Sequence, residues 1–140
     1  MDVRVALEAD PRRVADARRF AERTLDMWGL SDLGHTVALL VSELMTNAIL
    51  HARSDVVLTL RHDLDGVRVE VFDTSPVPPR LRHFRPEAAT GRGVRLLETL
   101  ASSWGIRRTP EGKCVWFTLA SSTQPTVQEW DFDLDAVEPL

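Results

Sequence analysis

The sequence predicts an α+β protein, a two-layer sandwich in which helices cover one face of a mixed or antiparallel sheet. Three observations lead to this fold class: short runs of alternating apolar residues indicate strands, longer runs with an apolar period of about 3.6 residues indicate helices, and an Asp-Gly pair indicates a hairpin. The 140 residues suffice for one domain with a single core. We therefore expect a folded domain over 1–120 and an acidic, disordered tail over 121–140.

Composition excludes several classes of function. No apolar run approaches the roughly 20 residues that span a bilayer, and the N-terminus lacks a signal-peptide pattern, so we expect a cytoplasmic protein without membrane contact. Cys114 is the one cysteine, which excludes an internal disulfide, and four scattered histidines give no zinc spacing. The net charge is −4, of which −5 belongs to 121–140, so the body carries +1 and we expect no direct nucleic-acid binding.

The first two elements are a strand and an amphipathic helix. Apolar residues alternate over Val3–Leu7, which predicts the strand. Asp10-Pro11 then supplies an N-cap and a proline at the first helical position, and apolar residues recur at helical spacing to Trp28, before Gly29 ends the segment. The remaining face of this helix is rich in arginine, which indicates either a solvated surface or a contact with an acidic partner.

A second helix is predicted from Ser31 or Asp32 to about Arg53, and its apolar residues cover so much of its circumference that we expect packing on more than one side. Glu43 and Asn47 stand four residues apart in it and so form one stripe at the edge of the core-facing side. Burying a carboxylate without a partner is costly. The stripe therefore indicates a site, or else a solvated glutamate beside a satisfied polar neighbour.

Two alternating runs, Val56–Arg61 and Val67–Phe72, are joined by a turn that contains Asp65-Gly66 and predict an antiparallel hairpin. The second run has its valines on one side and ends in Asp73. A carboxylate at a strand end is a rigid hydrogen-bond acceptor, suited to recognising an amine. An aspartate in this position also commonly initiates a turn.

The segment from Thr74 to Thr90 contains four prolines and three arginines, and we interpret it as a mobile loop over a site. Gly91-Arg92-Gly93 follows and opens a helix that begins at Val94. Glycines in such a position let the backbone approach a phosphate closely, and the helix start favours an anion. A lone Gly-x-Gly is also common in loops without any ligand.

The last elements complete the sheet. The helix is predicted to end near Trp104-Gly105. Ile106–Thr109 and Cys114–Leu119 then form a closing hairpin around a Pro-Glu-Gly turn. The tail that follows is rich in Ser, Thr and Pro and then acidic.

This ordered set, a helix with Glu and Asn, a strand that ends in Asp, and a Gly-x-Gly entering another helix, resembles the Bergerat-fold (GHKL) ATPases, the superfamily of gyrase, Hsp90, histidine kinases and MutL. Within it, the chain is most similar to the small anti-sigma factor serine kinases and their actinobacterial relatives. The resemblance runs from about Val3 to Leu119. It implies ATP and Mg²⁺ as cofactors, bound without a P-loop, since no G-x-x-x-x-G-K-[ST] occurs in the sequence.

The resemblance also assigns roles to residues by their place in the motifs. Asn47 matches the family's magnesium ligand, Asp73 the carboxylate that accepts the amine of adenine, and Glu43 the general base of phosphoryl transfer. The other positions that match nucleotide contacts are Ser75, Gly91, Arg92, Gly93 and Val94.

The chain departs from the family pattern in two places. The second motif usually reads Asp-x-Gly-x-Gly, whereas Ser75 and Val77 stand at the two glycine positions. The last strand usually carries Gly-x-Thr, and this chain has Gly112-Lys113-Cys114. The second departure removes one polar contact to the nucleotide.

A short domain with glutamate at this position resembles the branch that phosphorylates a serine of a STAS-type anti-anti-sigma factor and alternately binds a sigma factor. The resemblance further implies homodimerisation. Two alternatives stay open: a nucleotide-dependent binding switch without catalysis, and a degenerate domain that binds protein partners but no ATP.

Overall fold

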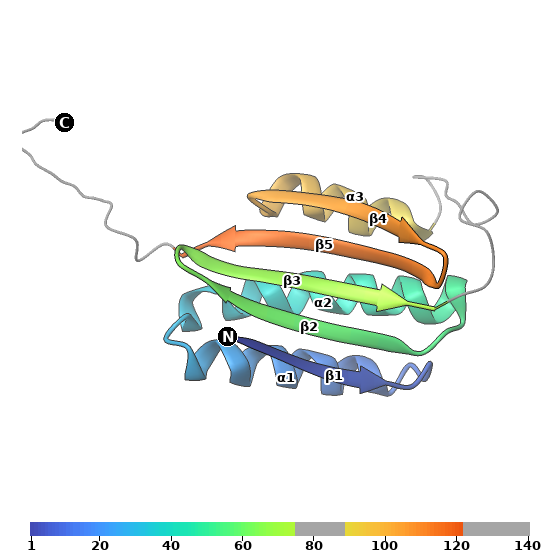
Figure 1. The fold of residues 1–140 in the computed structure, drawn as a ribbon, viewed down its shortest axis with the longest axis horizontal. Coiled ribbons are helices and arrows are strands. Elements are labelled where there is room, and N and C mark those ends of the chain that lie inside the picture. Colours follow the sequence, from blue (N-terminus) through green and yellow to red (C-terminus); the bar gives the residue numbers. More distant parts are fainter. Residues whose placement is uncertain (75–88, 122–140) are drawn as a thin grey trace, which may run out of the picture.

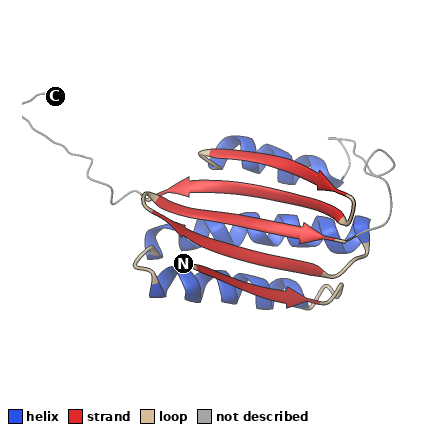
Figure 2. Cartoon of the chain, viewed as in Figure 1, coloured by secondary structure: helices blue, strands red, loops and turns tan. Residues whose placement is uncertain are grey.

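The computed structural model describes residues 1–74 and 89–121, with residues 51, 52 and 89–94 described by their backbone alone. Strands form a single sheet, and helices pack against one of its faces (Figures 1 and 2). The elements are β1 (Asp2–Leu7), α1 (Arg13–Met27), η1 (Ser31–Leu33), α2 (Gly34–Asn47), η2 (Ala48–Ala52), β2 (Val56–Asp63), β3 (Gly66–Asp73), α3 (Ala89–Leu100), β4 (Ser103–Thr109) and β5 (Gly112–Ala120).

The sheet has the strand order β1-β2-β3-β5-β4, and every pairing between its described strands is antiparallel. The predicted fold class, a two-layer α+β sandwich, is therefore confirmed, with the antiparallel form of the sheet. Valines of β3 alternate toward the helices, where Val67 and Val69 are fully buried. Because side chains alternate along a strand, Asp73 follows them onto the same, helix-facing side.

Helix α2 lies in the middle of the helical layer, between α1 and α3, and also contacts β3 of the sheet. Leu40, Val41 and Met45 are fully buried, as expected for a helix packed on more than one side. The segment Ser31–Leu50 is the one described helix long and apolar enough to cross a membrane, with a mean hydropathy of 1.4 and half of it buried inside the protein. A core helix has these same properties, which explains the finding without a membrane.

The end of the central helix is not regular α-helix. After Asn47 the chain widens into the π-helical turn η2, in which the N–H of Arg53 donates to the carbonyl of Ala48 at 2.9 Å. Arg53 then takes a left-handed conformation, with φ 54° and ψ 36°, which ends the helix. The predicted helix therefore has its expected extent, but the regular α-helical spacing holds only as far as Asn47.

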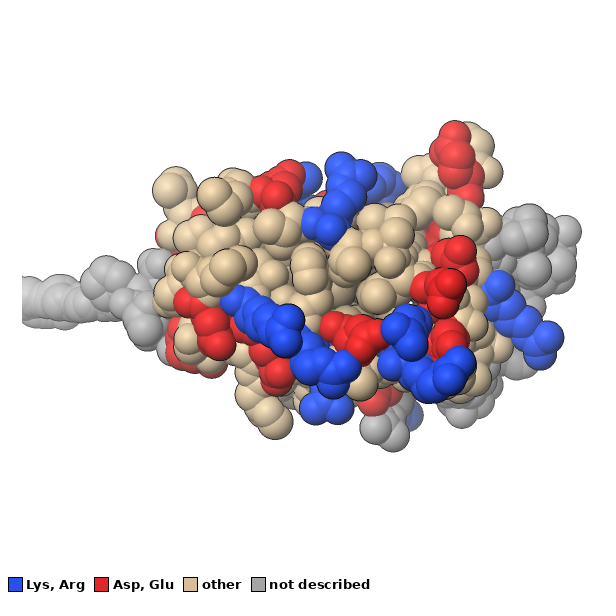
Figure 3. Space-filling model, turned by 90° about the horizontal axis from the view of Figure 1, so that it is seen from below, with Lys and Arg blue, Asp and Glu red and all other residues tan. Residues whose placement is uncertain are grey.

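Helix α1 has a face on which charges of both signs lie close together, at the edge that it forms with β1 (Figure 3). Asp16 pairs with both Arg13 and Arg19. Asp10 accepts hydrogen bonds from the backbone and the guanidinium of Arg12, which lower the pKa of its carboxyl to about 2. These pairings favour the solvated-surface interpretation of the arginines.

The boundaries of the last helix and strand correct the sequence prediction. α3 begins at Ala89 rather than Val94, and it ends at Leu100, so that Trp104 and Gly105 belong to β4. Glycine in a helix costs up to about 1 kcal/mol relative to alanine, which is why the pattern placed the start after Gly93. Packing of α3 against α2, through residues such as Leu97, outweighs that local preference.

Candidate functional site

Four elements bring their ends together at one end of the molecule, on the right in Figure 1: the C-terminal end of α2, the end of β3, the start of α3 and the β4–β5 turn. The predicted site residues lie on these ends. Glu43 and Asn47 come from α2, Asp73 from β3, and Gly91 and Gly93 from α3. The topology thus brings to one end of the molecule helix and strand ends that are far apart in the sequence.

Glu43 and Asn47 lie one turn apart on α2, and both are partly exposed. Residues with this spacing are neighbours on a helix surface, about 6 Å apart between Cβ atoms. Leu44 and Ala48, next to them, are buried. The pair therefore lies at the border between core and solvent, where a carboxylate and a carboxamide reach a ligand without losing their hydration.

The Asp73 side chain is buried, with 2% of its surface exposed, at the end of β3. Its Oδ2 atom lies 2.6 Å from Nζ of Lys113, the residue directly opposite on β5. The Lys113 side chain is 16% exposed. The sequence analysis identified Asp73 as an acceptor but did not identify this partner, since residues forty positions apart become neighbours only through the strand register.

Backbone contacts fix the position of Asp73. A Cβ atom on Gly112 would lie 2.0 Å from the Asp73 carbonyl oxygen, so only glycine allows β5 to approach this closely. On the other side, the N–H of Thr74 donates to Oγ of the buried Ser54 at 3.1 Å. The carboxylate is therefore attached to a strand end that is held by β5 on one side and by the segment before β2 on the other.

Cys114 follows Lys113 and is buried, with 1% of its surface exposed. Burial raises the pKa of its thiol, and the nearby Glu70 carboxylate raises it further. A neutral buried thiol is a poor nucleophile. We therefore assign Cys114 to packing and not to chemistry.

For the other residues predicted to contact the nucleotide, the structure describes either the backbone alone or nothing. Gly91, Arg92, Gly93 and Val94 lie in the first turns of α3, not in a loop before it. The first four N–H groups of a helix have no intrahelical acceptor, so those of 89–92 have no acceptor within α3. Ser75 lies outside the described residues, as does most of the predicted loop from Thr74 to Thr90.

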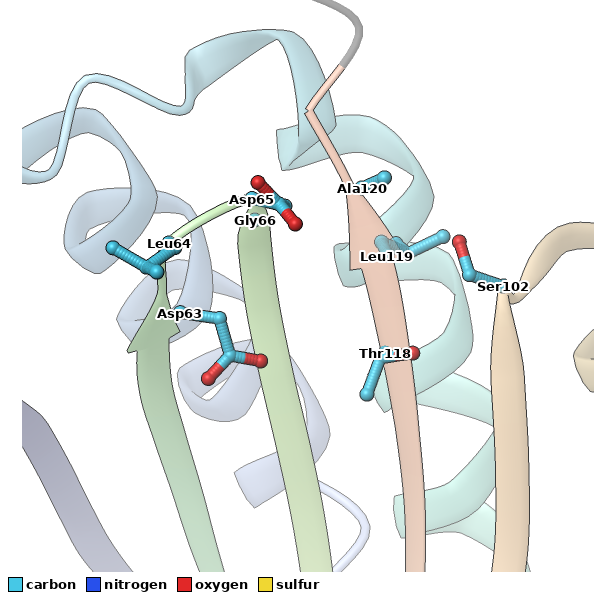
Figure 4. Close-up of a pocket in the computed structure, with 8 residues that line it drawn as sticks. All are labelled: Asp63, Leu64, Asp65, Gly66, Ser102, Thr118, Leu119 and Ala120. Carbon is cyan, nitrogen blue, oxygen red and sulfur yellow. The ribbon is translucent and has the colours of Figure 1, made fainter. Parts of the chain in front are cut away.

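Two hollows of the described surface lie away from the predicted site residues. One of about 470 Å³ lies beside the β2–β3 turn, at the opposite end of β3 from Asp73 (Figure 4). A second, of about 380 Å³, lies between α1 and β1, beside Phe20 and Arg23. Neither contains a predicted site residue.

The donor groups suit a magnesium ion held largely by phosphate and water. Among the described residues, no three His, Cys, Asp or Glu side chains gather as a metal site. Magnesium bound with a nucleotide usually takes only one or two protein ligands. The amide oxygen of Asn47, partly exposed beside Glu43, fits that need.

Comparison with known proteins gives a consistent result. Residues 7–119 match the family model of the histidine kinase-like ATPase domain. The search of curated proteins found no match.

Solved structures with the same fold include histidine kinases. The histidine kinase domain of the blue-light activated kinase EL346 from Erythrobacter litoralis is 26% identical, with a TM-score of 0.52 over 67% of this chain and 47% of that one. The EL346 kinase itself is 24% identical over 68% of this chain and 34% of that one, with a TM-score of 0.52. The nucleotide-free catalytic domain of the histidine kinase ThkA shows the fold alone, at 14% identity and a TM-score of 0.50, over 86% and 97% of the two chains. The chain thus spans about half or less of the EL346 chains that it matches.

The family match covers most of the chain, and the sheet order, central helix and convergent ends agree with it. Domains of this type bind ATP, usually with Mg²⁺. The chain belongs to the histidine kinase-like ATPase domain family.

Proposed function

We propose that this protein is a cytoplasmic, ATP- and Mg²⁺-dependent serine protein kinase and anti-sigma factor, with its catalytic domain over 1–120. Its substrate in this proposal is a serine of a STAS-type anti-anti-sigma factor, and its second partner is a sigma factor. The observation that carries the proposal is the placement of Glu43 one helical turn before Asn47, at the end of the molecule where Asp73 and the start of α3 also lie.

In the proposed reaction each of these side chains has one task. Asn47 would hold the magnesium ion, which would neutralise charge on the phosphates, and Asp73 would accept a hydrogen bond from the adenine amine. Glu43 accepts the proton of the serine hydroxyl as its oxygen attacks the γ-phosphorus and the bond to the β-phosphate oxygen breaks. The products are a phosphoserine, ADP and a protonated Glu43, which returns its proton to water.

The first test is the transfer of labelled γ-phosphate from ATP to candidate anti-anti-sigma factors by the wild-type protein and by Glu43→Gln. We expect the variant to lose transfer by a factor of about 100 or more, since general bases contribute 10²–10⁴-fold, and to keep its ATP affinity, because glutamine is nearly isosteric with glutamate. Glu22→Gln, on the exposed surface of α1, is the matched control and should transfer normally.

A nucleotide-dependent binding switch is the second candidate, and the departure from Gly-x-Thr at Cys114 favours it. In that case wild type and Glu43→Gln bind ATP equally, and ATP changes the affinity for a partner in both. Absence of label on every candidate partner, with ATP binding intact, would reject the kinase and leave the switch.

A further inference from the structure

Lys113 is the only lysine in the sequence, and the other sixteen of the 17 basic residues are arginines. This one ammonium is directed to the carboxylate of Asp73, at 2.6 Å, and both side chains are largely buried. Other ion pairs of the described residues use arginine, at the surface for Asp16 with Arg19 and partly buried for Arg68 with Glu70. The exception occurs at the carboxylate that the proposed function reserves for a nucleobase.

In the proposed function, the Lys113 ammonium and the adenine amine both donate to the Asp73 carboxylate. An ionised carboxylate only accepts hydrogen bonds, and at Asp73 little of it is exposed to a ligand. Gly112 packs against the Asp73 backbone, and the buried Ser54 binds the N–H of Thr74, so the strand end that carries the carboxylate is fixed in place. An amine that enters from solvent therefore meets an acceptor whose Oδ2 atom is already bound.

A lysine side chain is better suited than an arginine to an ion pair that must dissociate when a ligand binds. Arginine binds a carboxylate through a planar fork with two parallel hydrogen bonds, whereas lysine offers one compact charge on a flexible four-carbon stem. The stem of Lys113 starts at the first residues of β5, beside the β4–β5 turn, and the whole side chain is 16% exposed. The ammonium thus has a short way to water once its place at Asp73 is taken.

We propose that Lys113 competes with the nucleobase for Asp73 and must release this carboxylate when a nucleotide binds. This inference rests on the proposed nucleotide site. Part of the binding free energy is then spent on separating a largely buried ion pair, so the wild-type protein binds ATP more weakly than its contacts alone would allow. Lys113 in this role is a built-in competitor that sets the nucleotide concentration at which the site fills.

Calorimetric titration of the full chain with ATP and Mg²⁺ tests the competition. Lys113→Met keeps the length of the side chain and removes its charge, and we expect its Kd for ATP to fall about tenfold. Arg107→Met is the matched control, because Arg107 is exposed and its β5 partner is Cys114, so it lies on the other sheet face. Its Kd should stay within about twofold of wild type, whereas equal or weaker ATP binding by Lys113→Met would overturn the proposal.

A measurement on the wild-type protein covers the case in which Lys113→Met does not fold. Selective ¹⁵N-lysine labelling gives a single side-chain ammonium signal, because the chain has one lysine. Adenosine and ADP should shift this signal, and magnesium tripolyphosphate, which lacks a base, should not. A signal that ATP leaves in place at saturation contradicts the release of Asp73.

The results separate this inference from the proposed function. If wild type binds ATP and Lys113→Met binds it no more tightly, only the competition is wrong. If neither protein binds ATP, the nucleotide site itself is wrong and the competition with it. If both bind with the expected difference and no serine is phosphorylated, the competition stands and the kinase does not.

Discussion

At the scale of single residues, the site depends on close contacts that a sequence pattern does not show. Gly112 is the clearest case, because its missing Cβ is what allows β5 to lie against the end of β3. The contact also sets the position from which Lys113 reaches Asp73. A glycine that looks like part of a turn is therefore a structural part of the candidate site.

We expect Gly112→Ala to lower the free energy of unfolding by about 2 kcal/mol, since the added methyl group would lie 2.0 Å from the Asp73 carbonyl oxygen and force the strands apart. Gly34→Ala is the control: its Cβ would meet no atom within 4 Å and its φ is −58°, so stability should be unchanged or rise by up to about 1 kcal/mol. Urea unfolding followed by circular dichroism measures both. Equal stability of the two variants would contradict the contact.

At the scale of elements, α2 both fills the core and carries the two polar residues of the site. Its buried side fixes the rotation of the helix about its axis, and that rotation places Glu43 and Asn47 at the border with solvent. The π-helical turn after Asn47 ends the regular spacing at the point where the site begins. Turns of this kind are frequent at functional sites, and no residue pattern in 48–52 predicted this one.

Leu40→Ala should therefore cost about 2–5 kcal/mol of stability, because Leu40 is fully buried and its loss leaves a cavity under the sheet. Leu50→Ala, in η2, removes the same atoms from a side chain that is 55% exposed and should change stability by less than about 0.5 kcal/mol. Thermal and urea unfolding of the two variants check this difference. Similar losses in both would mean that α2 does not pack as described.

At the scale of the whole molecule, ligand binding and folding are linked, because the site is assembled from α2, β3, α3 and β5 and exists only in the folded chain. A ligand that binds only the folded state stabilises it by RT ln(1 + [L]/Kd). The fold itself then reports on the nucleotide. This linkage tests the site without any knowledge of the protein partners.

ATP with Mg²⁺ at about 100 times its Kd should raise the stability of the wild-type protein by about 2.7 kcal/mol and increase its Tm accordingly. Chelating the magnesium with EDTA should remove much of this increase, since Asn47 would hold the ion only together with the phosphates. Asp73→Asn turns an acceptor into a partial donor and should reduce the shift. A full shift in that variant would exclude Asp73 from the base pocket.

Much of the fold was predictable because it follows from local pattern. The alternation in Val67–Phe72 and the Asp65-Gly66 turn fix a hairpin, and the apolar circumference of 31–53 fixes a central helix. The predicted start of α3 at Val94 was wrong, because contacts with α2 outweighed the helix-breaking tendency of Gly91 and Gly93. For the same reason, Trp104 was placed in a helix when pairing with β5 makes it part of a strand.

The candidate site divides in the same way. The spacing of Glu43 and Asn47 and the strand-end position of Asp73 are local facts, and the elements that carry them end at one end of the molecule. Their catalytic and binding roles stay predictions. Neither the pairing of Lys113 with Asp73 nor the support from Ser54 has a local signal, since each joins residues twenty or more positions apart.

The sequence by itself determined the fold class, the central helix and the identity of the polar residues on it, because hydrophobic periodicity and turn residues act over a few positions. Only the tertiary structure decided which side chains meet: strand register set Lys113 opposite Asp73, and helix packing moved the start of α3. The physical reason is that register and packing are set by the summed burial of many side chains, a quantity that no single stretch of sequence contains.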